Sequence, residues 1–277
     1  MNKNTKRILK AAKKNYLLLV FVIIIFFVAV AVLYKNFFSS SQYFYAKVRV
    51  DYPASYYSKP DIWLTNSLRA GDRQSSLLGG SSAEILKVRY YPISTGNSSS
   101  NFNIFLTLRM EGSFDKKTKT FTFQRSNIST GSPITFNFSS AQIEGTVIDL
   151  SQTPFADSYI DKTVTLIWRA GYSQDFPYFY SNINVGDKYY DGSNYVFEIL
   201  DKHLENNVLA VPNYVTGQIF TQDISTIQNI VLTAKVKVLE RDNQFIFAGD
   251  QVLKIGNNLN ISTQNFDYNN FIISNIQ

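Results

Sequence analysis

From Tyr43 onward, apolar and polar residues alternate along much of the chain. Small or apolar side chains take every second position in residues 46–51, and the same spacing recurs in residues 103–110, 163–169 and 231–239. A period of two places alternate side chains on one face of a strand, so we predict half-buried β-strands in these segments. No long stretch after residue 34 has helical spacing, so the chain is predicted to be mostly β.

Residues 16–34 form a long apolar segment without any charged or strongly polar side chain. A helix of about 20 residues spans the hydrocarbon core of a bilayer. We therefore predict a transmembrane helix here, with Tyr16 and Tyr34 at its two interfaces. Ala29-Val30-Ala31 also matches the cleavage pattern of a secretory signal. The apolar run continues past that point and exceeds the usual length of a signal-peptide core, which favours an uncleaved anchor.

The positive charge of the chain is concentrated before this helix. Residues 1–15 hold six Lys and Arg residues and no acid, whereas the sequence after residue 34 balances 21 basic against 21 acidic residues. The positive-inside rule therefore predicts a plasma-membrane protein with a cytoplasmic tail and an extracytoplasmic remainder. A nucleic-acid-binding domain needs a basic surface on its folded part, so we expect no nucleic-acid partner. The absence of cysteine excludes a disulfide framework and thiol catalysis, and fits a bacterial cell envelope.

The second half of the exported part repeats the first. Gly71-Asp72 recurs as Gly186-Asp187, 115 residues later, and each pair is followed by the sequence Glu-Ile-Leu. Three further landmarks return in the same order: residues 103–107 as 229–233, 121–123 as 245–247, and 131–136 as 256–261. Self-similarity at a long period indicates a duplicated structural unit. The offset grows along the chain, which predicts an insertion at residues 206–227, with Pro212 and Gly217 marking a loop.

The predicted organisation has five parts. They are a basic cytoplasmic tail (1–15), a transmembrane helix (16–34), a tether (35–42), a first β module (43–152) and a second β module (160–277). The fold class is therefore one N-terminal helix followed by two tandem copies of a barrel-like or sandwich-like β module. The sequence leaves open whether the modules are separate domains or two halves of one barrel, because duplicated β halves can pair with each other to remove exposed edges.

Parts of both modules resemble a bacterial family catalogued as domain of unknown function 4330. The resembling pieces are Val185-Gly186-Asp187 with Glu198-Ile199-Leu200, Leu253 to Gly256 with Leu259 to Ile261, and Ile134 to Phe138 with Glu144 to Val147. The match covers most of residues 160–277. The resemblance implies an anchored domain of the cell envelope with no established activity.

The sequence offers little catalytic chemistry. His203 is the only histidine, which excludes a His-rich metal site, and we interpret it as a structural residue. Ser113 and Lys116 have the spacing of a lysine-activated serine, but they fall in a predicted hairpin rather than on one helical turn. Acid pairs such as Asp187 with Asp191, or Asp72 with Glu84, are more simply explained as turn caps. We therefore expect no catalytic residue, no cofactor and no metal ion.

The remaining candidate residues are structural glycine turns and aromatic clusters. In each Gly-Asp pair the glycine is predicted to take the positive-φ position of a tight turn, while the acid bonds to the turn backbone; these residues are Gly71, Asp72, Gly186 and Asp187. Five aromatic residues near predicted turns are candidate contacts for a protein partner or a glycan: Tyr178, Phe179, Tyr180, Tyr189 and Tyr190. Packing of these rings into the core is the competing interpretation.

Together these observations predict a non-enzymatic, single-pass envelope protein. Its duplicated β domain is expected to contact another protein, or a second copy of itself, near the outer membrane face. The alternatives are an envelope enzyme that acts on a cell-wall polymer through paired carboxylates, and a glycan-binding protein that uses the tyrosine clusters. An enzyme should bring acids with perturbed pKa values into one cleft, whereas a binding module should not.

Overall fold

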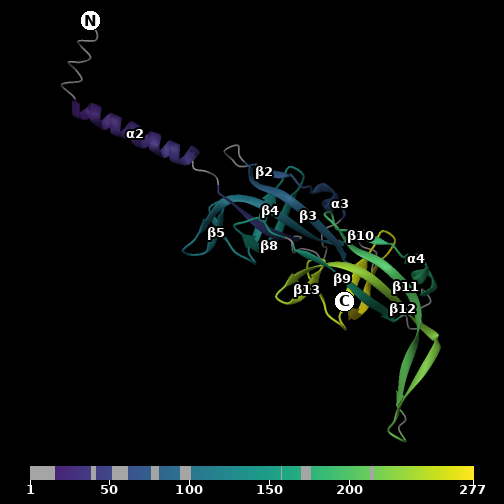
Figure 1. Cartoon of the computed structure of the whole chain (residues 1–277). Coiled ribbons are helices and arrows are strands. Elements are labelled where there is room, and N and C mark those ends of the chain that lie inside the picture. Colours follow the sequence, from purple (N-terminus) through teal and green to yellow (C-terminus); the bar gives the residue numbers. More distant parts are fainter. Residues whose placement is uncertain are drawn as a thin grey trace. The chain divides into compact units, whose positions relative to one another are not determined.

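In the computed structural model, the described residues are 16–38, 42–51, 62–75, 81–93, 101–156, 158–169, 176–212 and 215–277 (Figure 1). The chain divides into two compact units, residues 1–42 and residues 43–277.

The first unit contains helix α2 (Tyr16–Phe38), which begins where the sequence predicted a helix and extends four residues beyond the predicted end at Tyr34. The start of the predicted tether is therefore helical. The basic tail, residues 1–15, and residues 39–41 of the tether lie outside the described residues. Across the part of the chain that the structure describes, no helix reaches the length and hydropathy needed to cross a bilayer.

The first β module is a single antiparallel sheet in the order β2-β3-β4-β1-β8-β7, with β5 and β6 branching from the end of β4 (Figure 1). Its strands are β1 (Tyr43–Asp51), β2 (Arg73–Ser75), β3 (Ser81–Ile93), β4 (Asn101–Asp115), β5 (Thr120–Phe123), β6 (Ser126–Ile128), β7 (Pro133–Asn137) and β8 (Gln142–Ser151), and a short helix α3 (Ile62–Ser67) precedes β2. The alternation in residues 46–51 reappears as a strand whose buried side chains take every second position.

The second module repeats this topology strand for strand, in the order β10-β11-β12-β9-β16-β15, with β13 and β14 branching from β12. Its elements are β9 (Tyr159–Arg169), α4 (Phe176–Asn182), β10 (Lys188–Tyr190), β11 (Tyr195–Pro212), β12 (Ile219–Arg241), β13 (Gln244–Phe247), β14 (Gln251–Leu253), β15 (Asn258–Ser262) and β16 (Asp267–Ile276). The prediction of a mostly β chain with two tandem modules is confirmed.

Each module has its own hydrophobic core and a barrel-like curvature, so the two copies are not halves of one barrel. The first core includes Phe44 and Phe136, and the second includes Phe197 and Phe271. In the first module the opposite ends of the sheet meet, because the Asn137 amide donates a 3.0 Å hydrogen bond to Oε1 of Gln74. A side chain thereby satisfies part of an edge that an open sheet leaves unpaired.

The predicted Gly-Asp turns are present, and the same turn occurs twice in each module. Each begins with a buried Leu or Ile and places a glycine three residues later at a φ near +90°; the glycines are Gly71, Gly131, Gly186 and Gly256. The left-handed region is accessible to glycine without steric cost. The glycine amide donates a hydrogen bond of 2.7–2.8 Å to the carbonyl of a distant strand residue. The amide of that strand residue donates a hydrogen bond of 2.9–3.0 Å to the carbonyl of the residue that follows the glycine.

The strand residue that holds each turn also begins a β-bulge. These residues are Ile85, Val147, Ile199 and Ile273, all fully buried, and the strand register shifts directly after each one. A bulge bends its strand and increases the local twist. The paired turn and bulge therefore curve both halves of both sheets in the same way.

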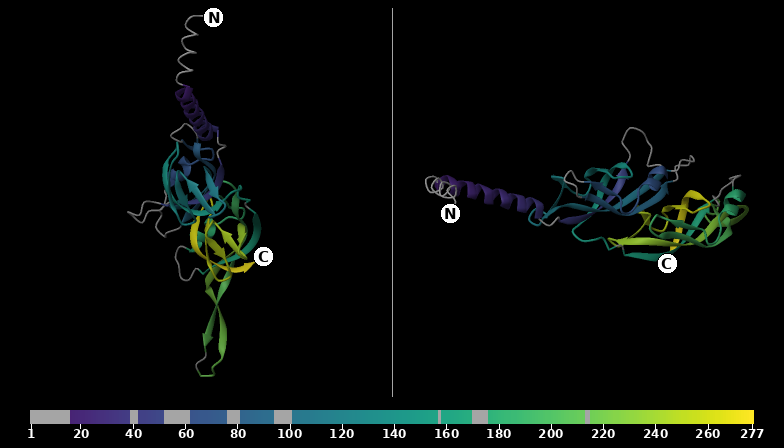
Figure 2. Two further views of the ribbon diagram at one scale, coloured as in Figure 1. Left: turned by 90° about the vertical axis from the view of Figure 1, so that its left-hand side faces the viewer. Right: turned by 90° about the horizontal axis from the view of Figure 1, so that it is seen from above.

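The predicted insertion is present and forms a two-stranded arm, and Gly217 lies outside the strands at its tip, in the loop that the sequence predicted. Strand β11 continues to Pro212 and β12 starts at Ile219, and the two stay in register from Asn207 opposite Ile224 to Pro212 opposite Ile219. The arm projects from the second module as a long ribbon (Figures 1 and 2). Pro212 stands at the strand end, where its missing N–H removes no bond from the middle of a sheet.

Candidate functional site at the boundary of the two modules

A buried polar cluster joins the two modules. The Tyr91 hydroxyl on β3 donates a 2.7 Å hydrogen bond to Oδ2 of Asp191, which is only 1% exposed. The other carboxylate oxygen of Asp191 accepts backbone hydrogen bonds of 2.8 Å from Ser193 and 2.7 Å from Asn194. Nε of Arg89, also on β3, lies 3.8 Å from Asp191. A buried carboxylate needs such partners because burial without them is costly.

The segment that carries Asp191 lies directly against the backbone of β3. The Tyr90 amide donates a hydrogen bond of 2.9 Å to the Asp191 carbonyl, and the Tyr189 hydroxyl donates a hydrogen bond of 2.7 Å to the Tyr90 carbonyl. Gly192 fits here because a Cβ at this position would lie 2.8 Å from the Val88 carbonyl oxygen. The contact therefore combines backbone pairing with close approach, and it fixes the two modules against each other.

The two tyrosines of this contact act as neutral donors. Burial raises the pKa of Tyr91 far above its usual value, and the nearby Asp191 carboxylate raises it further. Burial is also the largest cause of the raised pKa of Tyr189. Both hydroxyl groups therefore keep their protons throughout the physiological pH range.

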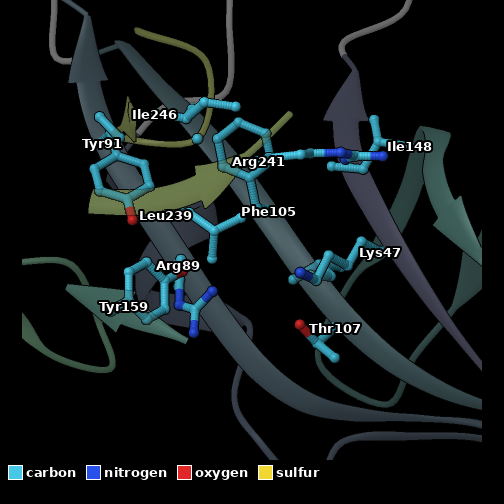
Figure 3. Close-up of a pocket in the computed structure, with 13 residues that line it drawn as sticks. Lys47, Arg89, Tyr91, Phe105, Thr107, Ile148, Tyr159, Leu239, Arg241 and Ile246 are labelled. Atoms are coloured by element: carbon cyan, nitrogen blue, oxygen red, sulfur yellow. The ribbon is translucent and has the colours of Figure 1, made fainter. Parts of the chain in front are cut away.

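A pocket opens beside this cluster, with walls from both modules (Figure 3). The first module contributes residues from β1, β3, β4 and β8, and the second contributes residues from β9, β12, β13 and the turn after β13. The lining is Lys47, Arg89, Tyr91, Phe105, Leu106, Thr107, Ile148, Tyr159, Leu239, Arg241, Ile246, Ala248 and Gly249. The cavity measures about 100 Å³.

The described lining of this pocket holds three cationic residues and no acid. Arg89 is nearly buried and its guanidinium lies over the Tyr159 ring, 4.9 Å from the centroid. Arg241 is half exposed, and its Nη1 is 3.9 Å from the Asp149 carboxylate. Lys47 lies over the Phe155 ring at 4.6 Å. Aromatic rings and aliphatic side chains form most of the remaining wall, so the pocket has a largely apolar lining with three positively charged side chains.

A further contact closes the boundary on the side of β14. Nδ2 of Asn103 on β4 donates a hydrogen bond of 3.2 Å to Oδ2 of Asp250. Gly249 touches the Phe105 ring so closely that a Cβ there would lie 2.6 Å from it. Ring contacts continue from Phe105 to Tyr91 and on to Tyr189, with centroids 6.1 and 6.4 Å apart. The boundary is therefore packed as well as hydrogen-bonded.

The structure separates the aromatic residues that the sequence grouped as partner contacts. Phe179 packs into the second core against Trp168, with ring centroids 4.8 Å apart. Tyr180 packs at the edge of that core beneath the Lys202 ammonium, and Tyr189 belongs to the module boundary. Tyr190 is 46% exposed and remains an accessible aromatic residue. The Tyr178 side chain lies outside the described residues.

The acids that the sequence singled out are engaged in structural roles. Asp72 and Asp187 accept turn amides of Arg69 and Asn184, both at 2.9 Å. Glu84 is held by two arginine side chains on neighbouring strands. Within the described residues, no three His, Cys, Asp or Glu side chains form a group that could hold a metal ion.

The other two chemical candidates also lie in ordinary structural settings. His203 is half exposed between Asp201 and Glu205 on the surface of β11, with both ring nitrogens 3.2 Å from a carboxylate oxygen. Ser113 is on β4, opposite Thr122, whereas Lys116 lies in the following turn. The predicted hairpin setting of the Ser-Lys pair is therefore confirmed.

The sequence did not indicate Arg89 and Tyr91, the two side chains of β3 that contact Asp191 in the boundary cluster. A weak signal existed for their partner, because the sequence Asp191-Gly192 indicated a turn cap, and the carboxylate does cap that turn. Nothing in the local sequence indicates that this capping acid also receives a hydroxyl from a residue 100 positions earlier.

Comparison with known proteins adds no assignment to this geometry. No family model matches the chain, no curated protein is similar to it, and no solved structure matches its fold.

Proposed function

We propose that the protein is a membrane-anchored, non-enzymatic interaction protein of the cell envelope, which associates with a second copy of itself through the β11–β12 arm. The observation that carries the proposal is the arm. It extends beyond the body of the second module, where β11 and β12 pair only with each other among the described strands.

The sequence of the arm supports association. Residues 206–222 contain no charged side chain and are rich in Val, Leu, Ile and Phe. Val215 at its tip is 94% exposed and Ile219 is 71% exposed. Soluble monomers usually protect free strand edges with charges, because unpaired backbone groups recruit other strands. Two identical antiparallel edges can pair about a twofold axis, so a second copy is the simplest partner.

The anchor is supported by the sequence of α2. Its first 19 residues are uncharged, six cations precede them, and the side chains of Phe21, Phe26 and Phe27 are exposed. A helix that is apolar on all sides needs an apolar environment. We place the tail in the cytoplasm and residues 43–277 on the outer side of the plasma membrane.

Single-cysteine labelling tests this topology, because the natural chain has no cysteine to interfere. Asn257→Cys lies in an exposed turn of the second module, and Asn4→Cys lies in the tail. In intact cells a membrane-impermeant maleimide should label position 257 and should reach position 4 only after permeabilisation. The reverse pattern, or labelling of both sites in intact cells, would contradict the proposed orientation.

Shortening the arm tests the association. Replacing residues 207–227 by Asn-Gly joins Asn206 to Gln228, which already face each other, through a favoured two-residue hairpin turn. Light scattering of the full chain in detergent should give a dimer, and the shortened variant should be a monomer with an unchanged thermal midpoint. Equal masses for two well-folded proteins would contradict the proposed role of the arm.

Glycan binding is a second candidate, favoured by one observation. The exposed rings of Tyr190 and Tyr195 contact each other, with centroids 5.3 Å apart, beside a groove that includes Arg69 and Lys87. Aromatic faces of this kind suit sugar rings. Retention of the full chain on purified cell-wall material, and its loss in Tyr190→Ala with Tyr195→Ala, would support this function; retention that survives both substitutions would remove it.

A further inference from the structure

The β4–β5 hairpin extends from the end of the first module at which β1 begins (Figure 1). Tyr43, the first residue of β1, pairs with Glu111, and β4 runs antiparallel to β1 and continues to Asp115. At about 3.3 Å per residue, β4 therefore extends roughly 13 Å past the start of β1. The loop of residues 116–119 lies at the tip of this extension.

The chain before this module is short. Helix α2 ends at Phe38 and β1 begins at Tyr43. The residues between them span at most about 18 Å when the backbone is fully extended. The extension of β4 past Tyr43 is of similar length. The tip of the hairpin can therefore reach the membrane surface if α2 is the anchor of the proposed function.

The loop at this tip is basic. Lys116, Lys117 and Lys119 are exposed, and none of the three forms an ion pair within the part of the chain that the structure describes. Asp115 at the base of the loop accepts the Lys117 amide at 2.8 Å, and this hydrogen bond is the largest cause that lowers the pKa of its carboxyl. The acid holds the turn backbone, and the three ammonium groups face solvent.

Lys119 has a backbone conformation that does not favour lysine. Its φ is +55°, in the left-handed region, where glycine and asparagine are the usual residues. In the second module Asn243 precedes β13 in the same way and has a φ of +60°. A residue held against its backbone preference points to a role for its side chain.

Aromatic packing holds the hairpin in place. Phe114 on β4 and Phe121 on β5 are partly buried, with ring centroids 4.7 Å apart. Phe121 also lies 5.1 Å from the ring of Phe44, which belongs to the first core. The lysines are therefore carried by a hairpin that is braced against the core of its module.

The second module provides a comparison for this hairpin. Its loop is Asp242-Asn243, which carries an acid and no cation. Arg241 at the end of β12 lines the boundary pocket and lies 3.9 Å from Asp149 of the module that precedes it. The hairpin of the second copy thus meets what comes before its own module. The repeated topology gives the first hairpin the same relation to the start of its module, which α2 precedes.

We propose that the loop of residues 116–119 binds the anionic headgroups of the membrane that holds the anchor. This inference rests on the membrane anchor of the proposed function. Clustered lysines beside an anchor attract anionic lipids, and the attraction falls off within a Debye length, about 8 Å at physiological ionic strength. The contact fixes the orientation of the first module at the bilayer, which a tether alone would leave free to rotate.

The test uses the full chain in nanodiscs with a fluorescent label on the loop. Because the natural chain has no cysteine, Thr118→Cys carries one nitrobenzoxadiazole label, and Asn243→Cys carries the same label on the loop of the second module. The discs contain phosphatidylcholine alone or an equal mixture with phosphatidylglycerol, and some headgroups carry a nitroxide quencher. Quenching at position 118 should be at least about twofold stronger in the anionic discs, and position 243 should be quenched weakly in both.

Charge-removing variants separate lipid contact from a loss of structure. The triple variant Lys116→Gln, Lys117→Gln and Lys119→Asn removes the charges and places asparagine at the positive φ, which it tolerates. Its thermal midpoint should be unchanged or higher, and quenching at position 118 in anionic discs should fall to the level of neutral discs. Lys254→Gln, an exposed turn position in the second module, should leave the quenching unchanged.

The outcomes distinguish this inference from the proposed anchor. Equal quenching at positions 118 and 243 in anionic discs, equal quenching at position 118 in both kinds of disc, or full quenching in the triple variant would overturn the lipid contact. Co-elution of the chain with the discs would show in each of these cases that the anchor stands. A chain that does not co-elute with discs would remove the anchor, and the lipid contact with it.

Discussion

Tyr91 and Asp191 stand 100 residues apart in the chain, yet the Tyr91 hydroxyl donates a 2.7 Å hydrogen bond to the buried Asp191 carboxylate across the boundary of the two modules. Tyr91→Phe keeps the ring and removes only this donor. A hydrogen bond to a charged group contributes about 1.5–3 kcal/mol, so we expect the free energy of unfolding to fall by about 2 kcal/mol. Urea titration of the full chain in detergent measures this loss.

The matched control for that substitution is Tyr195→Phe on the surface of the second module, where the ring is 59% exposed. It should change the free energy of unfolding by less than about 0.5 kcal/mol. If Tyr91→Phe is equally mild, the boundary hydrogen bond does not hold the modules together.

The four glycine turns should respond alike to substitution. At Gly71, Gly131, Gly186 and Gly256 a Cβ would meet no atom within 4 Å, so the backbone conformation is the only obstacle. Alanine in the left-handed region costs about 1–2 kcal/mol, whereas asparagine tolerates that region better. We therefore expect Gly186→Ala to lower the thermal midpoint and Gly186→Asn to restore part of the loss.

Gly112 should show the opposite preference, because its constraint is space rather than backbone angle. A Cβ there would lie 2.2 Å from the Thr122 carbonyl oxygen and 2.7 Å from the Phe44 ring. Gly112→Ala should cost about 1–3 kcal/mol through overpacking, and Gly112→Asn should cost more than alanine. Thermal melts of the four variants at positions 112 and 186 decide this, and asparagine rescue at position 112 would contradict it.

His203 should titrate above its ordinary value. Hydrogen bonding to Glu205 is the largest cause that raises its pKa, and Asp201 raises it as well. A raised folded-state pKa means that protonation favours the folded state: the stabilisation is complete below the unfolded value near 6.5 and disappears as pH rises through the folded value. NMR titration of the imidazole protons measures the pKa directly.

In the same titration, Glu205→Gln should lower the pKa of His203, and Asp201→Asn should lower it by less. Lys237→Gln is a suitable control, since Lys237 pairs with Asp161 on neighbouring strands. An unshifted imidazole in the natural protein would show that the two carboxylates do not hold this side chain in solution.

The sequence predicted the β character, the duplication and the turns because each rests on local physics. Alternation marks the strands, and Gly-Asp marks a positive φ with a capping acid, as Gly186 and Asp187 demonstrate. Gly131 and Gly256 form the same turn without an acid, since Ser132 and Asn257 follow them, and the sequence analysis used their segments only as landmarks of the repeat.

The boundary cluster, the arm and the exposure of the aromatic residues depended on contacts that no local sequence pattern encodes. The boundary cluster joins β3 to a turn after β10, and its residues follow no shared motif. Pro212 correctly indicated the end of a strand, but no local pattern indicated the two paired strands that form the arm. Aromatic grouping also failed as a guide to exposure, since Phe179 is packed and Tyr190 is accessible.

The position of β1 in its sheet has a consequence for the order of events during synthesis. This strand is made first but lies in the middle, and its second neighbour, β8, is completed about 100 residues later, when Ser151 reaches Tyr45. Contacts so distant in sequence form slowly. While the ribosome adds β2 to β7, one side of β1 has no native partner, so a nascent chain would need shielding until β8 emerges.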